Sequence, residues 1–237
     1  MKIALITYAS KCFKYSYADS DRYFKYAERL KESLNQVNFS GDFYLFTEQN
    51  LDFPSHELVP YAFKPYAIKK VKDMGYDIVI WIDSAVYPTK NFDHFIKHIE
   101  VTGHAFFDNI GFVIRDHTSD NCLEYFHMSD EESWKHPMIM ACLMGFDFRH
   151  KITNEIFDDY YVAANEKAYG GDWVNNDLQV SKNSKVRGHR HDQSAMSIIL
   201  AKKGIKPLHP NSTFFAYYGN PGHEPHADTL CFLSKGF

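Results

Sequence analysis

Short apolar runs alternate with amphipathic segments through the first half of the chain. The runs have the length of single buried strands, and they predict strands at residues 2–8, 42–47, 76–82 and 104–107. Between them, apolar residues recur at the spacing of one helix face, which predicts helices at residues 21–37 and 63–74 and a short helix between Pro88 and Gly103. Alternating strands and helices are typical of an α/β fold, so we expect a Rossmann-like, mostly parallel central sheet flanked by helices.

The pattern is looser in the second half. We expect loop and helix at residues 108–137, a strand at 138–146, helices at 153–164 and 191–203, a loop at 169–187, and a last strand or two within 205–218. No internal repeat, heptad array or obvious linker interrupts the chain, which predicts one domain over residues 1–237.

One apolar run ends on a candidate ligand-binding group. Residues 77–86 read Asp-Ile-Val-Ile-Trp-Ile-Asp-Ser-Ala-Val, so Asp83 directly follows a predicted strand. In open α/β sheets the crevice at the carboxyl ends of the strands binds ligands. Asp83 is therefore a candidate to bind a divalent cation or a sugar hydroxyl.

Composition and charge narrow the class of protein. The formal net charge is −4 and the pI is near 6.3, which disfavours nucleic acid as a main partner. The four cysteines are far apart, which argues against a disulfide framework or a zinc ribbon. No apolar run approaches the roughly 18 residues of a membrane span, and no signal sequence is evident, so we expect a soluble, cytoplasmic protein. The chain also lacks the glycine-rich signatures of P-loop NTPases, dinucleotide dehydrogenases and serine hydrolases.

Three segments in order resemble one enzyme family. Phe-Lys-Pro-Tyr-Ala-Ile-Lys-Lys at residues 63–70, followed by the run at 77–86, resembles the GT-A-fold nucleotide-sugar glycosyltransferases, whose strand leads into an Asp-x-Asp motif. Residues 188–200, which contain Asp-Gln-Ser, resemble a helix start in many such transferases, and the apolar run at 139–146 precedes them.

The resemblance covers roughly residues 2–204. It implies a single GT-A-like domain, with a nucleotide-sugar-binding half at residues 1–103 and a smaller acceptor-side half with a C-terminal tail at 104–237. It also implies the transfer of a hexose from a nucleoside-diphosphate sugar, with a UDP-sugar as the first candidate, to a hydroxyl of a glycan or other acceptor.

The resemblance and the charge of the donor together name candidate site residues. Asp192 and Asp83 are the candidate catalytic carboxylates, although a carboxylate at a helix start is also a good cap. Lys64 is the first candidate to offset the charge of the leaving diphosphate. The candidate donor-binding residues are Thr7, Tyr8, Lys14, Lys64, Asp83, Ser84, Ala85, Arg190 and Gln193.

The motif departs from the family at its last position. Ala85 stands where a second carboxylate is common, which leaves the use of Mg²⁺ or Mn²⁺ open. Asp83, with His223 from the tail, is the candidate pair of metal ligands, and cationic side chains are the alternative.

Three alternatives remain at this point. A sugar-nucleotide nucleotidyltransferase shares a Rossmann-like half but normally carries a glycine-rich, basic loop after its first strand, which residues 9–20 lack. A degenerate transferase that only binds glycan would explain Ala85. A viral-type enzyme that glycosylates a DNA base fits the compact chain, but the acidic net charge disfavours it.

Overall fold

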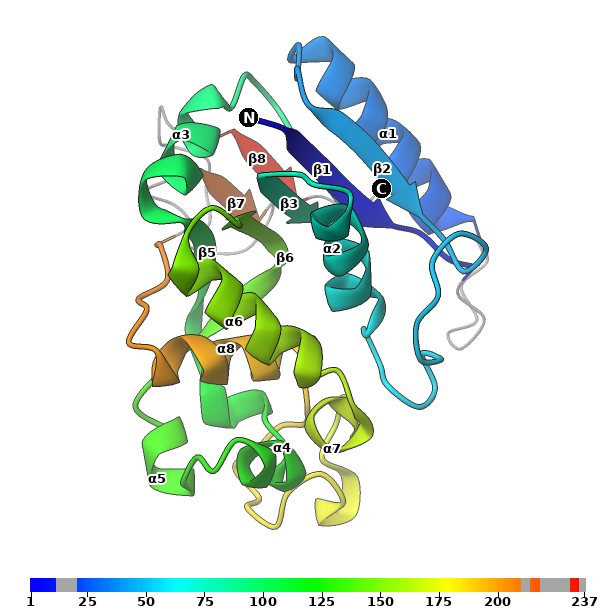
Figure 1. Ribbon diagram of the computed structural model, residues 1–237. Helices are drawn as coiled ribbons and strands as arrows, with labels where there is room; N and C mark the ends of the chain where they lie inside the picture. Colours follow the sequence, from blue (N-terminus) through cyan, green and yellow to red (C-terminus); the bar gives the residue numbers. More distant parts are fainter. Residues whose placement is uncertain (12–20, 210–213, 218–230, 235–237) are drawn as a thin grey trace.

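A five-stranded sheet forms the centre of the molecule. The computed structural model describes residues 1–11, 21–209, 214–217 and 231–234. In spatial order the strands are β2 (Asp42–Phe46), β1 (Ile3–Tyr8), β3 (Ile78–Ile82), β6 (Pro137–Asp147) and β5 (His104–Val113) (Figure 1). β1 pairs in parallel with β2 and β3, whereas β6 runs antiparallel to both β3 and β5. The expected α/β class is confirmed, and the sheet is mixed because β6 runs against the other four strands.

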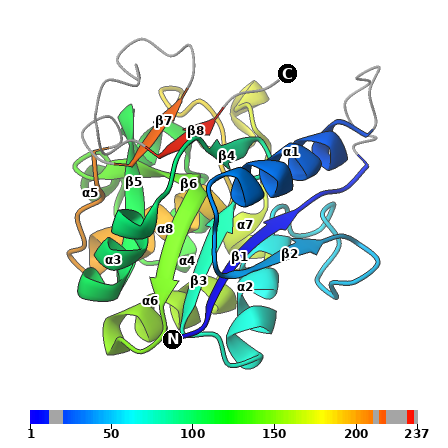
Figure 2. The same ribbon diagram turned by 90° about the horizontal axis from the view of Figure 1, so that it is seen from above.

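Strand β3 shows why the sheet is covered on both faces. All five of its residues are buried, and their side chains alternate between two cores. Val79 and Trp81 belong to the core under α2 (Phe63–Asp73), α6 (Lys151–Val162) and α8 (Asp192–Lys202). Ile78, Ile80 and Ile82 belong to the core under α1 (Arg22–Gln36) and α3 (Asp93–Thr102). Figure 2 shows α2 and α6 on one side of the central strands and α1 and α3 on the other.

A second, three-stranded sheet packs on the side of α1 and α3. It consists of β4 (Val86–Pro88), β8 (Phe232–Ser234) and β7 (Phe215–Tyr217), with β8 in the middle (Figure 2). Phe215 and Phe232 are fully buried in the same core as Phe95 and Phe107. The strand predicted within residues 205–218 is present as β7. Strand β4 was not predicted, because three residues give too short a pattern.

The looser region of the sequence contains short helices around α8. These are a 3-10 turn at Ile114–His117, α4 (Asp120–Tyr125), α5 (Asp130–Ser133), α7 (Glu166–Tyr169) and a 3-10 turn at Asn176–Leu178. Buried Arg115 joins several of them, since its guanidinium donates to Asp120, Asp130 and Ser181. The strand predicted at 104–107 is longer than expected, because β5 continues to Val113 through irregular pairing with β6.

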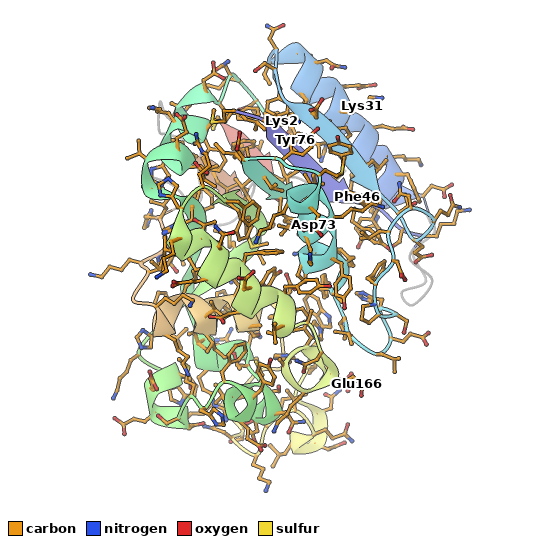
Figure 3. All side chains as sticks on the ribbon, in the orientation of Figure 1. Lys2, Lys31, Phe46, Asp73, Tyr76 and Glu166 are labelled. Atoms are coloured by element: carbon orange, nitrogen blue, oxygen red, sulfur yellow. The ribbon has the colours of Figure 1, made fainter. Side chains whose placement is uncertain are left out.

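The candidate site residues lie where the parallel strands end. Lys2 and Tyr76, which precede β1 and β3, mark the edge where the parallel strands begin, and Phe46 marks the end of β2 (Figure 3). Asp83 follows β3 at the opposite side, where the parallel strands end. Helix α2 begins after the chain has left the end of β2 on the same side. The start of α2 and the end of β3 are therefore neighbours. Within the described part of the chain, no helix is both long and apolar enough to cross a membrane.

Two glycines provide a matched test of packing behind α3. Gly103 (φ 87°) and Gly75 (φ 83°) both have left-handed backbones, but a Cβ atom at Gly103 would lie 2.9 Å from Thr153 Oγ1, whereas one at Gly75 would meet nothing within 4 Å. We expect Gly75→Ala to lower the free energy of unfolding by about 1–2 kcal/mol through backbone strain alone. Gly103→Ala should lose about 1–3 kcal/mol more through the close contact. Urea unfolding followed by circular dichroism measures both, and equal losses would contradict this account of the packing.

Candidate active site at the carboxyl ends of the strands

A buried lysine joins two carboxylates from distant parts of the sequence. Lys64 lies in the first turn of α2 and is 3% exposed. Its Nζ atom is 3.2 Å from Asp83 Oδ1 and 3.0 Å from Asp192 Oδ2, and it donates a hydrogen bond to the Ala141 carbonyl at 3.0 Å. The structure thus brings together three residues that the sequence nominated separately. We call Asp83, Lys64 and Asp192 the triad.

The protonation of the triad follows from burial and close charges. Burial alone lowers the pKa of Lys64, but the carboxylates of Asp192 and Asp83 reverse this effect and the pKa is raised. Burial raises the pKa of Asp192 to about 6, and Asp83 raises it as well, although Lys64 acts in the opposite direction. Near neutral pH Lys64 is therefore an ammonium held between two acidic side chains.

The two carboxylates differ in their access to solvent. The Asp83 side chain is 39% exposed, whereas that of Asp192 is 4% exposed. Asp83 is also fixed in place, because its Oδ1 atom accepts a hydrogen bond from Trp81 Nε1 at 2.8 Å and its backbone N–H donates to the Cys142 carbonyl at 2.8 Å. Asp83 is therefore the oriented carboxylate of the triad that a ligand can reach.

Asp192 does not act as the cap of α8. His191 occupies the cap position, with a φ of 48° and no side-chain capping bond, and Asp192 is the first helical residue. Its carboxylate instead pairs with Lys64. Asp192 also stands in the first turn of α8, where a carboxylate complements the helix dipole, so a role at the helix start and a role in the triad are compatible.

An aromatic cluster borders the triad on the side of α8. The Tyr61 ring lies 5.4 Å from Lys64 Nζ, is stacked on the His191 ring at 5.4 Å, and lies 5.9 Å from the Trp173 ring. Tyr61 and His191 both have positive φ angles, 63° and 48°, which are strained for bulky side chains. Such strain is concentrated at functional sites.

A second aromatic group follows β1. The Tyr8 ring is stacked on Phe63 at 4.2 Å, with Phe53 at its edge. Burial and the nearby Glu48 raise the pKa of Tyr8 to about 12, so its hydroxyl stays neutral. Thr7 is fully buried beneath it and does not reach solvent.

The remaining predicted residues lie around the triad. Ser84 is 4% exposed, and the Ala85 carbonyl accepts a hydrogen bond from Arg29 Nη2 at 3.0 Å. The Gln193 amide donates to the Ile139 carbonyl at 2.6 Å, and the Arg190 guanidinium lies 4.0 Å from the centre of the Trp173 ring. Lys14 and His223 lie outside the described residues.

The side chains at the triad do not fit a metal held by the protein alone. Over residues 1–11, 21–209, 214–217 and 231–234, no group of three or more His, Cys, Asp or Glu side chains could hold an ion. Asp83 Oδ1 faces the Lys64 ammonium, and Asp192 is paired with the same cation. A divalent cation beside them would be repelled by Lys64. Because His223 lies outside the described residues, the candidate pair of Asp83 and His223 stays a prediction.

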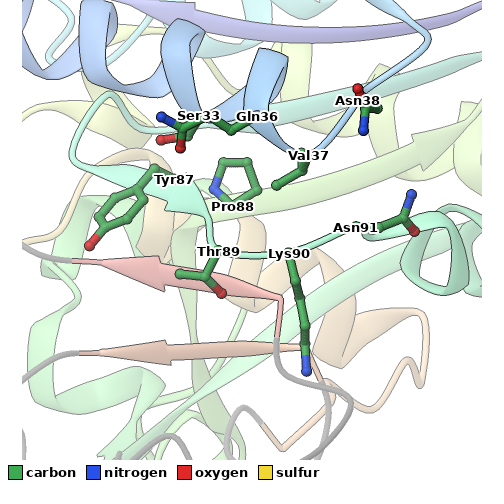
Figure 4. Close-up of a pocket in the computed structure, with 9 residues that line it drawn as sticks. All are labelled: Ser33, Gln36, Val37, Asn38, Tyr87, Pro88, Thr89, Lys90 and Asn91. Atoms are coloured by element: carbon green, nitrogen blue, oxygen red, sulfur yellow. The ribbon is translucent and has the colours of Figure 1, made fainter.

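Two cavities lie away from the triad. One, of about 510 Å³, lies between the end of α1 and the segment after β4, and Figure 4 shows Val37 and Pro88 among its lining residues. The other, also about 510 Å³, lies beside Arg115. Neither cavity is lined by a residue of the triad, so the candidate site is defined by its charged groups and not by these two cavities.

Sequence reasoning did not single out Tyr61, Trp81 or Trp173. Trp81 is hidden in an apolar run that reads as core, and its hydrogen bond to Asp83 depends on the turn after β3. Tyr61 and Trp173 lie in segments without periodicity, and no local signal distinguishes them from other aromatic residues.

Removing the cation of the triad tests its structural role. We expect Lys64→Met to lower the free energy of unfolding by about 3–5 kcal/mol, because a buried carboxylate loses its partner. It should also raise the pKa of Asp192 further above 6, which carboxylate NMR titration would measure. Lys69→Met is the matched control on the same helix, since Lys69 is 40% exposed and pairs with Asp73, a surface contact worth about 0–1 kcal/mol. Equal losses in both variants would contradict the assignment.

Comparisons with known proteins were made by sequence and by structure. No family model matches the chain, and no curated protein matches it. Among solved structures, a glycosyltransferase involved in the glycosylation of the major capsid of PBCV-1 is similar, with a TM-score of 0.54 and 14% identity over 99% of this chain and 93% of that one.

The WbbM bifunctional glycosyltransferase, in its apo form, is also similar, with a TM-score of 0.55 and 12% identity. The match covers 98% of this chain but 45% of WbbM, so the chain spans less than half the length of that protein. Identities this low establish the fold and not the activity. The chain has a GT-A-like glycosyltransferase fold.

Proposed function

We propose that this protein is a glycosyltransferase that moves a hexose from a nucleoside-diphosphate sugar to a hydroxyl of an acceptor. The observation that carries the proposal is the triad. A fixed, exposed carboxylate and a buried lysine–aspartate pair meet at the carboxyl ends of the parallel strands, where α/β folds bind ligands. The similarity to two glycosyltransferases supports the same reading of the fold.

The donor is assigned to the groups at the ends of β1 and β3. The stacked rings of Tyr8 and Phe63 offer a flat aromatic surface for a nucleotide base. Asp83 is close by, because Phe63 lies 5.9 Å from Trp81, whose indole binds Asp83. A carboxylate in this position accepts hydrogen bonds from sugar hydroxyls. UDP-sugars are the first donors to test.

The reaction needs a base and a compensated leaving group. Transfer forms a bond between the acceptor oxygen and the anomeric carbon, and it breaks the bond from that carbon to the diphosphate, which leaves with the electron pair. The hydroxyl proton passes to a carboxylate of the triad, of which Asp83 is the exposed member. Asp192, at 4% exposure, acts by keeping Lys64 in place, so it is a positioning residue.

Nucleotide-sugar binding is the first test. The unfolding temperature of the wild type, with Mg²⁺ and Mn²⁺ present, should rise with UDP or with at least one of UDP-glucose, UDP-galactose and GDP-mannose, because a ligand that binds only the folded state stabilises it. Asp83→Asn should abolish most of this rise and lower donor turnover by about 10²-fold or more. Asp73→Asn is the control, since Asp73 pairs with Lys69 on the surface and should respond as the wild type does. A wild type that no nucleotide stabilises would contradict the proposal.

Activity should fall in acid through the pKa of Asp192. The ionised form of Asp192 holds Lys64, and burial raises the pKa of Asp192 to about 6, so the ion pair is lost as the pH falls through this range. We expect kcat/KM to fall as the pH drops below about 6. Asp192→Asn resembles the protonated form, so its activity should be low and nearly constant from pH 5 to 7. Initial rates across this range measure the effect, and an unchanged acid limb in Asp192→Asn would show that another group causes it.

A further inference from the structure

Trp173 is an exposed aromatic residue on a fixed piece of backbone. It lies between α7 and α8 and is 41% exposed. Backbone hydrogen bonds join its neighbours to the segment before α8, from His189 to the Asp172 carbonyl at 2.8 Å and from Asn175 to the Arg187 carbonyl at 2.9 Å. A Cβ atom at Gly188 would lie 2.0 Å from the Trp173 carbonyl oxygen, so the backbone segments at Trp173 and Gly188 are in close contact. The indole is therefore held in place before any ligand arrives.

The surroundings of the indole combine apolar and hydrogen-bonding surface. The Arg190 guanidinium lies 4.0 Å from the ring centre, and the rings of Tyr61 and His191 lie 5.9 Å and 5.7 Å away. A guanidinium carries five N–H donors and lies flat on an aromatic face. Arg190 covers one face of the indole, and the part of Trp173 that stays exposed has the guanidinium at its border; we call Trp173, Tyr61 and Arg190 the Trp173 platform.

The Trp173 platform is continuous with the triad. Tyr61 contacts Trp173 on one side and lies over Lys64 Nζ on the other. His191, which contacts both rings, directly precedes Asp192 in the chain. The second aromatic group, Tyr8 with Phe63, contacts the triad through Trp81 instead. Two aromatic surfaces thus border the triad, one after β1 and one before α8.

We propose that the Trp173 platform is the acceptor subsite and that the acceptor is a carbohydrate whose pyranose ring lies on the indole of Trp173. This inference rests on the proposed function, because it supplies the second substrate of the same reaction. A pyranose has an apolar C–H face and a rim of hydroxyls, so it matches an aromatic face flanked by N–H donors. A ring seated there lies beside the triad, where one of its hydroxyls can meet the donor.

The first experiment measures binding at the indole itself. The chain has three tryptophans, so ¹⁵N NMR gives three indole N–H signals, and Trp173→Phe identifies the one from Trp173. Methyl glycosides of glucose, galactose and mannose, and the disaccharides lactose and maltose, are titrated to tens of millimolar. We expect a saturable shift of the Trp173 signal with at least one of them and no shift of the Trp134 signal, since Trp134 lies after α5 and bonds Asp130. No shift with any saccharide would overturn the proposal.

The second experiment separates the acceptor from the donor. With the saccharide that binds, Trp173→Ala should lower the ratio of transfer to donor hydrolysis at least tenfold, and Trp173→Phe should recover most of it because a flat ring remains. Trp134→Phe should keep the wild-type ratio. An unchanged ratio in Trp173→Ala, or transfer to a peptide or lipid alcohol and to no saccharide, would overturn the acceptor assignment while leaving the transferase intact. If no nucleotide sugar binds or turns over, the proposed function fails, and the NMR titration still reports whether Trp173 binds a saccharide.

Discussion

The buried ammonium of Lys64 is the constraint around which the candidate site is built. An isolated charge in the core is highly unfavourable, so the chain must supply counter-charges and an acceptor at fixed positions. Asp83, Asp192 and the Ala141 carbonyl do so from the end of β3, the start of α8 and the middle of β6. Three elements that are distant in sequence thereby have one common contact. The same contact holds Asp83 Oδ1 at 3.2 Å and opposes the rise in pKa that burial imposes on Asp192, so structure and chemistry depend on one group.

Much of this site was predictable because the relevant signals are local. A short window of sequence shows each of its parts: a buried strand that ends before Asp83, a helix that begins near Lys64 and a helix that begins at Asp192. Because ligands bind at the carboxyl ends of strands in open α/β sheets, Asp83 is also expected in a crevice. The direction of β6 and the three-residue strand β4 were not predictable in this way, because each depends on a partner elsewhere in the chain. The site roles of Tyr61 and Trp173 depend on contacts that form only after folding, and no local pattern marks them.

The positions of the aromatic residues show how the two sides of the site differ. After β1, the rings of Tyr8 and Phe63 stack on one another, and Phe53 lies at the edge of Tyr8. Before α8, the rings of Tyr61 and His191 require positive φ angles, and the exposed indole of Trp173 is backed by close backbone contact at Gly188. Strained backbone persists only where the surrounding structure fixes it. Between the two aromatic groups, the strain is thus confined to the residues before α8, and the two sides of the site are built differently.

The absence of a second carboxylate at position 85 changes how the charge of a bound donor must be balanced. Lys64 is already paired with Asp83 and Asp192, and a nucleoside diphosphate is itself anionic, so the charge of a bound donor must be balanced largely by groups outside the triad. At the turn after β3, the cation that the structure places nearby is Arg29, which donates to the Ala85 carbonyl and lies 4.3 Å from the centre of the Tyr87 ring. With Ala85 the turn has no second carboxylate after Asp83, so a diphosphate brought to this edge of the sheet meets one negative charge fewer.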